Sequence, residues 1–421
     1  MDGRRVGVYP LTAENAAVIR EVFPFAAPAR LPAHLPSFGC GDRLGLANPG
    51  HLRALRGFRV APVLAQQSVR ELNLTGRSFT QVIDAATWAV LQEGYEGGFG
   101  ADGDHLKTLA EVRMALAAGM SMITLDLSLC LGATGLPSCP SVLLGWAGQS
   151  FNLNGREVVL TEKTIEDFWR VYGAALSFIR EADVLCREYR GAEGYDLEIS
   201  VDETPEETRL EDHLLFGLEM ERLGIRPFSL APRFPGEFQK AVDYRGDLKR
   251  FEAALSSHAF LARRFGYRLS VHSGSDKFTV FPVVGRLTAG RFHLKTAGTS
   301  WLVALGVVAV KDPALFRRLY AKAVSSLAEA KKYYHIDTGP ADVGPIDALP
   351  TAALPELLRD DRSRQLLHIT YGQLLTDPEL GPAFFRLLEG EEEAYYEALG
   401  EHFRRHFRTL GIPEEGSPFP A

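Results

Sequence analysis

The chain alternates between short apolar runs and helical segments, and this alternation is the strongest constraint on its fold. Runs rich in β-branched or aromatic residues lie at 60–65, 122–127, 195–201, 227–232, 267–271 and 291–294. Segments with helical periodicity lie between or after them, at 106–118, 164–190, 207–223, 247–265 and 312–332. Strand, loop and helix repeated in this order predict a parallel sheet with crossover helices.

Polar clusters occur at or just beyond the ends of the expected strands. They read GADGDHLKT, DLS, VDET, RFPGE, HSGSDK and HLKTAGTSW. In a (β/α) barrel the C-terminal strand ends open onto one mouth, where catalytic residues gather. An open doubly wound sheet would instead concentrate such residues at one crevice. The distribution therefore favours an α/β fold of the TIM-like barrel type.

We expect three parts along the chain. Residues 1–57 are rich in Pro, Gly and Arg and would form an N-terminal cap segment, with a strand-like piece at 5–9. Residues 58–375 would form the catalytic barrel, and 376–421 a C-terminal helical extension packed on it. The extension has one predicted apolar helix face, because these residues recur at spacings of three and four: Tyr396, Leu399, Phe403, Phe407 and Leu410.

Composition narrows the class of protein. The formal net charge is -7 and no basic block reaches five residues, which argues against a nucleic-acid surface. The 4 cysteines form no C-x-x-C pair. The N-terminus lacks the apolar core of a signal peptide, and the longest apolar run, 301–310, is about half a membrane span. These features predict a cytoplasmic enzyme with neither a membrane nor a nucleic-acid partner.

The stretch GFGADGDHLKT, residues 98–108, matches the glycine pattern of dinucleotide-binding folds. Such a fingerprint follows a buried strand, whereas the preceding VLQEGYEG is polar and interrupted by glycine. Asp104 would also meet a pyrophosphate with like charge. We interpret the stretch as an active-site loop in which Asp104 and His105 face a ligand, with a plain turn as the alternative. Imidazole beside carboxylate is typical of divalent-metal and acid/base sites.

Two later clusters have a similar composition. In YRLSVHSGSDKF, His272 ends an apolar run and precedes Asp276 and Lys277. In FHLKTAGTSW, Lys295 and Thr296 offer an ammonium and a hydroxyl that could hold a carboxylate or sugar hydroxyls. Each cluster also has a purely structural interpretation, because a lone strand-end histidine is often only a hydrogen-bonded core residue.

Other candidates follow from the strand pattern. In YDLEISVDET, Leu197 and Ile199 would face the helices, so Glu198 would face the barrel interior. An interior carboxylate is costly unless it is paired, protonated or metal-bound, which makes Glu198 a functional candidate. Further polar side chains at strand ends could line a sugar pocket or bind a ligand: Gln66, Gln67, Ser68, Arg70, Arg233 and Glu237.

Two histidines of the C-terminal helix, His402 and His406, are four residues apart. Their motif, H-F-R-R-H, lacks the glutamate of zinc proteases and contains arginines, so we expect a solvated helix face. For His368, in LHITYG, the sequence is compatible with either a structural or a functional role. The Gly-x-Ser-x-Gly and Walker-type motifs are absent, which argues against the commonest serine hydrolases and kinases.

Taken together, these clusters resemble the tagaturonate epimerase family, which is related to enzymes used as tagatose 4-epimerases. The resemblance runs from FGCGDRLGL to LHITYG and rests on AQQSVREL, ATWAVLQEGY, GFGADGDHLK, LEISVDET, VHSGSDKF, HLKTAGTSW and LLHITYG. The family usually has Ala where this chain has Gly103. The resemblance implies a metal-dependent isomerase that interconverts D-tagaturonate and D-fructuronate.

Site roles follow from the same resemblance. Asp104 would be the proton acceptor and Glu198 the proton donor, while His105, Glu237 and His272 would bind a divalent cation such as Zn, Mn, Co or Ni. Two imidazoles and one carboxylate leave open positions for substrate oxygens, which is typical of a catalytic metal site.

D-tagaturonate and D-fructuronate differ in configuration at one carbon. That carbon is β to both the ketone and the carboxylate, so enolisation cannot invert it. We therefore expect retro-aldol cleavage and re-addition, with Lys277, Lys295 or Arg70 binding the substrate carboxylate. Transient oxidation would need a nicotinamide cofactor, which the poor glycine context disfavours. A metal-dependent isomerase or aldolase of a related ketose and a non-catalytic sugar-acid binding protein remain alternatives. The chain is also compatible with a homo-oligomer.

Overall fold

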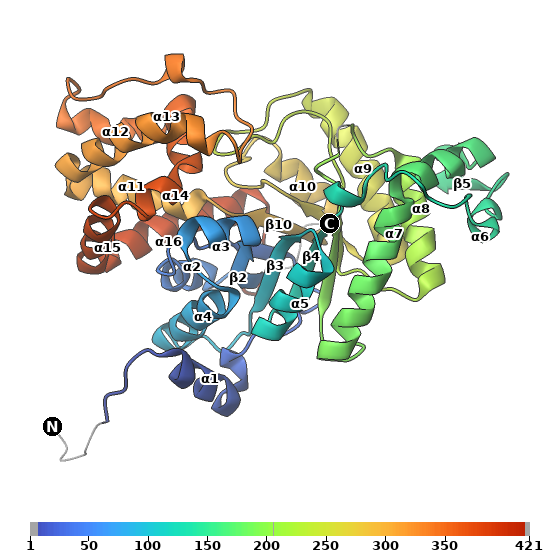
Figure 1. Ribbon diagram of the computed structural model, residues 1–421, viewed down its shortest axis with the longest axis horizontal. Helices are drawn as coiled ribbons and strands as arrows, with labels where there is room; N and C mark the ends of the chain where they lie inside the picture. Colours follow the sequence, from blue (N-terminus) through green and yellow to red (C-terminus); the bar gives the residue numbers. More distant parts are fainter. Residues whose placement is uncertain (1–6, 205, 417–421) are drawn as a thin grey trace.

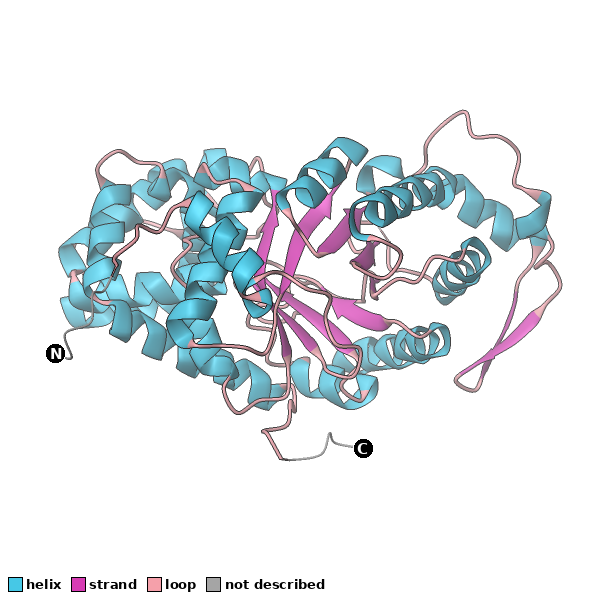
Figure 2. Ribbon diagram, turned by 90° about the horizontal axis from the view of Figure 1, so that it is seen from below, coloured by secondary structure: helices cyan, strands magenta, loops and turns pink. Residues whose placement is uncertain are grey.

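Eight parallel strands close into a barrel in the order β1-β10-β9-β8-β7-β4-β3-β2. The strands lie at the centre of the molecule, with helices around them (Figure 2). The computed structural model describes residues 7–204 and 206–416. The barrel strands are β1 (Ser37–Cys40), β2 (Ala61–Ser68), β3 (Gly100–Leu106), β4 (Met122–Asp126), β7 (Asp196–Ser200), β8 (Ser229–Ala231), β9 (Arg268–Val271) and β10 (Phe292–Thr296). The expected TIM-like barrel is confirmed.

Helices cover the outside of the barrel (Figures 1 and 2). They are α2 (Asn48–Leu55), α3 (Val69–Thr75), α4 (Phe79–Glu93), α5 (Leu109–Ala118), α7 (Glu162–Arg190), α8 (Leu210–Leu223), α9 (Leu248–Phe265), α10 (Phe281–Thr288) and α11 (Thr299–Lys311). Local sequence fixes several ends, since Ser68, Ser78 and Thr108 each form a capping box. Left-handed glycines such as Gly224 and Gly266 end helices.

Two barrel strands were not expected from the sequence. β1 lies inside the segment 1–57 that we assigned to a cap, so this segment contributes to the barrel itself. β3 coincides with the cluster GADGDHL, which we interpreted as a loop. Both strands lack an apolar run, because β1 is four residues long and β3 buries two aspartates. Of the strand-like piece at 5–9, residues 5 and 6 lie outside the described residues and 7–9 have no regular structure.

A helical lobe adjoins one side of the barrel (Figure 1). It contains α12 (Pro313–Ala330), α13 (Asp361–Ile369), α14 (Tyr371–Leu375) and α15 (Leu380–Gly390), and therefore begins well before residue 376. The last helix, α16 (Glu392–Thr409), returns to the barrel. Its predicted apolar face is buried as expected. An added Cβ at Gly50 of α2 would lie 2.8 Å from Leu399, so glycine permits the close approach of α2 and α16.

The remaining elements decorate the barrel. They are α1 (Ala13–Val22), α6 (Ser141–Leu144), the antiparallel pair β5 (Ser150–Leu153) and β6 (Arg156–Val159), and the 3-10 helices η1 (Pro24–Ala26), η2 (Ser128–Cys130), η3 (Pro340–Asp342) and η4 (Thr351–Leu358). The β5–β6 pair lies far from the helical lobe (Figure 2). No helix in the described part of the chain is both long and apolar enough to span a membrane.

Candidate active site

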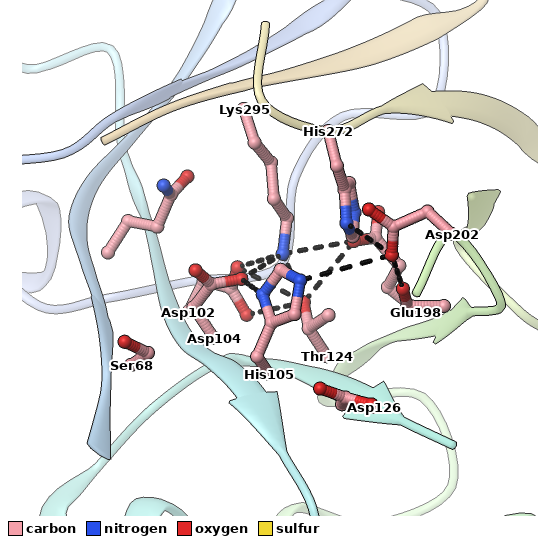
Figure 3. Close-up of polar contacts among 12 residues, drawn as sticks. Ser68, Asp102, Asp104, His105, Thr124, Asp126, Glu198, Asp202, His272 and Lys295 are labelled. Atoms are coloured by element: carbon pink, nitrogen blue, oxygen red, sulfur yellow. Dashed lines mark hydrogen bonds and ion pairs between the residues drawn. The ribbon is translucent and has the colours of Figure 1, made fainter. Parts of the chain in front are cut away.

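The barrel interior is polar and centres on one ammonium group (Figure 3). Lys295 of β10 lies with its Nζ 2.7 Å from Asp102 Oδ2, 2.7 Å from Asp104 Oδ1 and 2.9 Å from Glu198 Oε1. It also donates to the hydroxyl of Thr124. Barrel interiors are usually filled by bulky branched side chains, so a buried cation with three carboxylates marks this interior as a functional site.

These charges shift one another's pKa values. Burial alone would lower the pKa of Lys295, but the three carboxylates hold it well above its ordinary value. Burial raises the pKa of Asp104, yet His105 and Lys295 outweigh it and hold the value well below normal. The pKa of Glu198 is likewise held low, by Lys295 and His272 against the effect of burial. Asp102 differs, because burial raises its pKa to about 6 despite Lys295. Asp104 and Glu198 therefore keep their negative charge more firmly than Asp102 does.

An irregularity in β3 places two adjacent side chains in the same site. Successive strand residues normally face opposite sides of the strand. Because Asp102 and Asp104 both point inward, a regular strand would turn His105 outward. The register of β3 against β4 shifts between Gly103 and Leu106, and His105 has a left-handed φ of 53°. This bulge turns His105 inward, so that its Nδ1 lies 2.7 Å from Asp104 Oδ1. Gly103 faces the opposite side, where an added Cβ would lie 2.8 Å from Ala115 of α5.

His105, Asp202 and His272 form a cluster at the mouth. One ligand atom from each lies within 4.8 Å of the others, which is close enough to hold a metal ion. His272 Nδ1 is 3.3 Å and His105 Nε2 is 4.0 Å from Asp202 Oδ1. The opposite nitrogen of each ring contacts a carboxylate, since His272 Nε2 is 2.6 Å from Glu198. Metal-binding histidines are oriented by such carboxylates, which fix the tautomer and leave the other nitrogen free.

The donor set fits a divalent cation. His272 Nδ1 is buried, and its contact of 3.3 Å with Asp202 Oδ1 does not have the geometry of a hydrogen bond. Asp102, Asp104, Glu198 and Asp202 carry four negative charges when ionised, and among the described residues Lys295 is the one ammonium that forms ion pairs with any of them. Without a cation the imidazoles must supply the missing positive charge. Burial lowers the pKa of His272, but Asp202 and Glu198 outweigh it and raise the value to about 10.

Glu237 is not a member of this cluster. Its carboxylate accepts a hydrogen bond of 2.9 Å from Gln239, and its backbone pairs with that of Arg245. It does line the wall of a cleft of about 450 Å³ that also contains Asp202 and His272. A smaller cavity of about 30 Å³ lies deeper, against Asp104 and Lys295. Lys240, His272 and Ser273 line both spaces, so the cleft leads to the buried carboxylates.

The expected substrate-contacting residues separate into two groups. Arg70 lines the cleft and Lys295 lines the deep cavity. Lys277 is fully buried, and its ammonium donates to the carbonyls of Gln239, Val242 and Ser275, so it does not face the site. The Thr296 hydroxyl donates to the Gly39 carbonyl at 2.6 Å, and the Ser68 hydroxyl caps α3.

Gln67 lies beside Gly103 in the register of β2 and β3, and it lines neither the cleft nor the deep cavity. Its neighbour Gln66 lies beside Asp102, lines the deep cavity and leaves its Oε1 without a hydrogen bond among the described residues. Alternation along β2 thus selects Gln66 rather than Gln67 as the inward amide.

Sequence reasoning missed three members of the site, Asp102, Asp202 and Lys240. Asp202 could have been predicted from the sequence, because Glu198, Ser200 and Asp202 occupy alternate positions and therefore share one face. In the structure the Ser200 hydroxyl donates to Asp202. Asp102 could be found only once β3 was recognised as a strand. Lys240 lies between β8 and α9, outside any periodic segment, and has no local sequence signal.

The expectation of a solvated face at His402 and His406 is wrong. His406 is fully buried, and its Nδ1 lies 2.9 Å from the His402 carbonyl. The backbone N–H of Asp276 donates to His406 Nε2 at 3.2 Å, and His402 Nε2 lies 2.8 Å from Asp276 Oδ1. Arg364 holds the other carboxylate oxygen of Asp276. Through these contacts with Asp276, the two histidines connect α16 to the loop that follows His272.

Comparison with known proteins identifies similar chains along nearly the whole length. A model of the tagaturonate epimerase family matches residues 2–133 and 141–410. The tagaturonate/fructuronate epimerase of Thermotoga maritima is 39% identical over 411 residues, which cover 94% of this chain and 85% of that protein.

Solved structures show the same similarity. The native fructuronate-tagaturonate epimerase of Cohnella laeviribosi superimposes with a TM-score of 0.90 at 41% identity, covering 97% of this chain and 89% of that one. A glycerol complex of the same enzyme also gives a TM-score of 0.90 at 41% identity, covering 98% and 88%.

Proposed function

Because the chain belongs to the tagaturonate epimerase family, we propose that it interconverts D-tagaturonate and D-fructuronate at the C-terminal mouth of the barrel. One observation in the site carries the proposal. Two ionised carboxylates, Asp104 and Glu198, come from different strands, share the ammonium of Lys295, and adjoin the histidine cluster. Such a pair can exchange a proton with a substrate hydroxyl that lies on either face of its carbon.

The reaction chemistry favours cleavage of a carbon–carbon bond. Asp104 accepts the proton of the hydroxyl on the inverting carbon, and that carbon becomes an aldehyde. The bonding electrons pass to the ketone-bearing fragment, which becomes an enediolate. After the aldehyde rotates, the enediolate attacks its other face, the bond re-forms, and the new alkoxide takes a proton. Atoms and charge balance without an external oxidant or reductant.

Lys295 can connect the two bases during this cycle. It lies within hydrogen-bond distance of both, so the proton accepted by Asp104 can pass through the ammonium to Glu198 and then to the alkoxide. The lysine keeps its charge throughout this relay. A low pKa at both carboxylates keeps them ionised in the resting enzyme, ready to accept the proton first in either direction.

His105, Asp202 and His272 would hold the divalent cation that the family resemblance implies. When bound, the cation supplies Lewis-acid stabilisation of negative charge that develops on the ketone side. Zn, Mn, Co and Ni all suit imidazole and carboxylate ligands. Asp104 and Glu198 orient the two rings, so the catalytic carboxylates also position the metal ligands.

Removing the cation should abolish turnover. Treatment with a chelator is expected to lower the rate at least about 100-fold, because Lewis-acid stabilisation contributes several kcal/mol, and one of the four metals should restore it. Metal analysis of two matched variants then identifies the carboxylate ligand. Asp202→Asn should lose bound metal, whereas Glu237→Gln should retain it; the reverse pattern would make Glu237 the ligand, as the resemblance implied. Full activity in the metal-free protein would reject this metal role.

Isotope and fragment experiments test the bond cleavage. During the reaction in deuterated water, the inverted carbon should acquire no carbon-bound deuterium, because its own hydrogen never leaves. Uptake there would reject cleavage. An added excess of a labelled three-carbon aldehyde acid should enter the product pool, since the fragment exists during each turnover. Exclusion of the label together with a tightly bound nicotinamide would instead favour transient oxidation.

A further inference from the structure

The cleft beside the histidine cluster is lined by three cations with no carboxylate partner among the described residues: Arg70, Arg233 and Lys240. Lys240 lies in the loop after β8, and its Nζ donates to Ser273 Oγ at 2.8 Å. Arg70 is the second residue of α3, and its guanidinium lies 4.6 Å above the ring of Tyr334. Its one hydrogen bond among the described residues is a long one of 3.4 Å to the Tyr333 carbonyl. Both side chains therefore keep donors free for a ligand.

Four other cations near the site are already neutralised or saturated. Lys295 is surrounded by three carboxylates, and Lys107 pairs with Asp126 at 3.1 Å. Arg43 pairs with Glu71 at 2.9 Å. Lys277, as described above, is saturated by backbone carbonyls, which removes it from the residues we first expected to bind the substrate carboxylate. Arg233 is the third cation of the cleft without a carboxylate partner, but its guanidinium makes a short hydrogen bond of 2.5 Å to the Thr204 carbonyl, unlike the long contact of Arg70.

Two tyrosines in edge-to-face contact, Tyr334 and Tyr371, support Arg70. The hydroxyl of Tyr334 lies 3.0 Å from that of Tyr371, and Arg43 lies 3.8 Å above the Tyr371 ring. A guanidinium supported on an aromatic face loses less freedom when it binds an anion, and its planar fork matches a carboxylate. The acidic residues of the cleft are engaged elsewhere: Asp202 contacts His272, Glu203 lies 3.5 Å from Lys107, and Glu237 accepts from Gln239.

We propose that Arg70 and Lys240 form the subsite for the substrate carboxylate, and that this pair makes the enzyme prefer hexuronates to neutral ketohexoses. The identity of the sugar acid rests on the proposed function. Two cations that line one cleft without a carboxylate repel each other, and an anionic ligand relieves that repulsion. A neutral sugar, which ends in a hydroxymethyl group, gains no such benefit.

The position of Lys240 gives the substrate an orientation. Lys240 and His272 both line the cleft and the deep cavity, so the subsite adjoins the histidine cluster. The carboxylate end of the sugar acid would lie toward Arg70 in the wider cleft. The ketone end would then lie toward His272, with the inverting carbon between them, near Asp104 at the deep cavity.

The test compares Arg70→Met, Lys240→Met and a matched surface control, Arg245→Met, whose guanidinium pairs with Asp337 and Asp361 on the exterior. Kinetics are measured with D-tagaturonate and with D-tagatose, which has a hydroxymethyl group in place of the carboxylate. Each cleft variant should raise KM for tagaturonate about 10- to 100-fold, the usual loss for a hydrogen bond to a charged group, while kcat changes little. Neither variant should change kcat/KM for tagatose by more than about threefold. If tagatose is not turned over, its inhibition constant replaces kcat/KM.

Calorimetric binding of both sugars to all four proteins separates this inference from the proposed function. If the wild type binds tagaturonate more tightly than tagatose without converting it, and the cleft variants lose that preference, the subsite stands while the epimerase proposal fails. Equal losses for both sugars, an unchanged KM for tagaturonate, or a wild type that does not prefer the acid would each overturn the subsite.

Discussion

Replacing Asp104 with Asn should lower kcat for D-tagaturonate about 10³-fold, and Glu198→Gln should lower it similarly, because general acid–base groups contribute about 10²- to 10⁴-fold. Both substitutions keep the shape of the side chain and remove its ability to take a proton. KM should change much less, since neither residue is assigned to the substrate carboxylate. The loss should appear in both reaction directions, because each carboxylate serves one face of the same carbon.

A matched amide substitution controls for charge removal near the site. Glu203→Gln removes a carboxylate that lines the cleft and pairs with Lys107 at 3.5 Å, away from Lys295. It should retain at least about a third of wild-type kcat, as expected for a group outside the proton transfers. Thermal unfolding of all three variants shows whether each is folded. A folded Asp104→Asn or Glu198→Gln protein with wild-type kcat would remove that residue from the mechanism.

The substitution Lys295→Met should cost the fold about 3–5 kcal/mol of unfolding free energy, the usual penalty for removing one partner of a buried ion pair. The ammonium is 4% exposed and neutralises three buried carboxylates. Without it, the folded-state pKa of these carboxylates rises above the unfolded value. Their unfavourable contribution is then absent at pH values below the unfolded pKa, grows as the pH rises from the unfolded to the folded pKa, and is fully present above the folded pKa.

Urea unfolding at about pH 5 and pH 8 measures this effect, with Lys163→Met as the control. Lys163 is 83% exposed and forms only an i,i+4 pair with Asp167, so its loss should change stability little. The deficit of Lys295→Met relative to the control should be larger at the higher pH. A Lys295→Met protein as stable as the control at both pH values would show that the carboxylates do not depend on this ammonium.

Periodicity in the sequence was sufficient to predict the barrel and the inward position of Glu198. Leu197 and Ile199 are apolar and adjacent to it, so alternation leaves one orientation for the carboxylate. The predicted strand positions also placed Asp104, His105 and His272 at one mouth of the barrel, because parallel strands end at the same rim. These inferences succeeded because each depends on a local pattern that the barrel geometry then repeats.

The missed features depend on the conformations of individual residues. The bulge at His105 has no hydrophobic signature, and β3 resembles a loop because buried ion pairs replace its apolar side chains. Lys277 and Lys295 both follow a histidine within a few residues. Lys277 nevertheless donates to backbone carbonyls, whereas Lys295 forms ion pairs with carboxylates. Only the path of the loop after β9, with left-handed Ser273 and Asp276, distinguishes them.

The attachment of α16 also affects how the protein becomes functional during synthesis. Phe403 and Phe407 pack against Phe38 of the first barrel strand, and His402 and His406 hold Asp276, four residues after His272. The ribosome makes the chain from its N-terminus, so all eight barrel strands are synthesised before α16. A nascent chain on the ribosome can therefore pair all eight strands before the loop beyond His272 acquires its last contacts. The ability to bind sugar should appear only after α16 has left the exit tunnel.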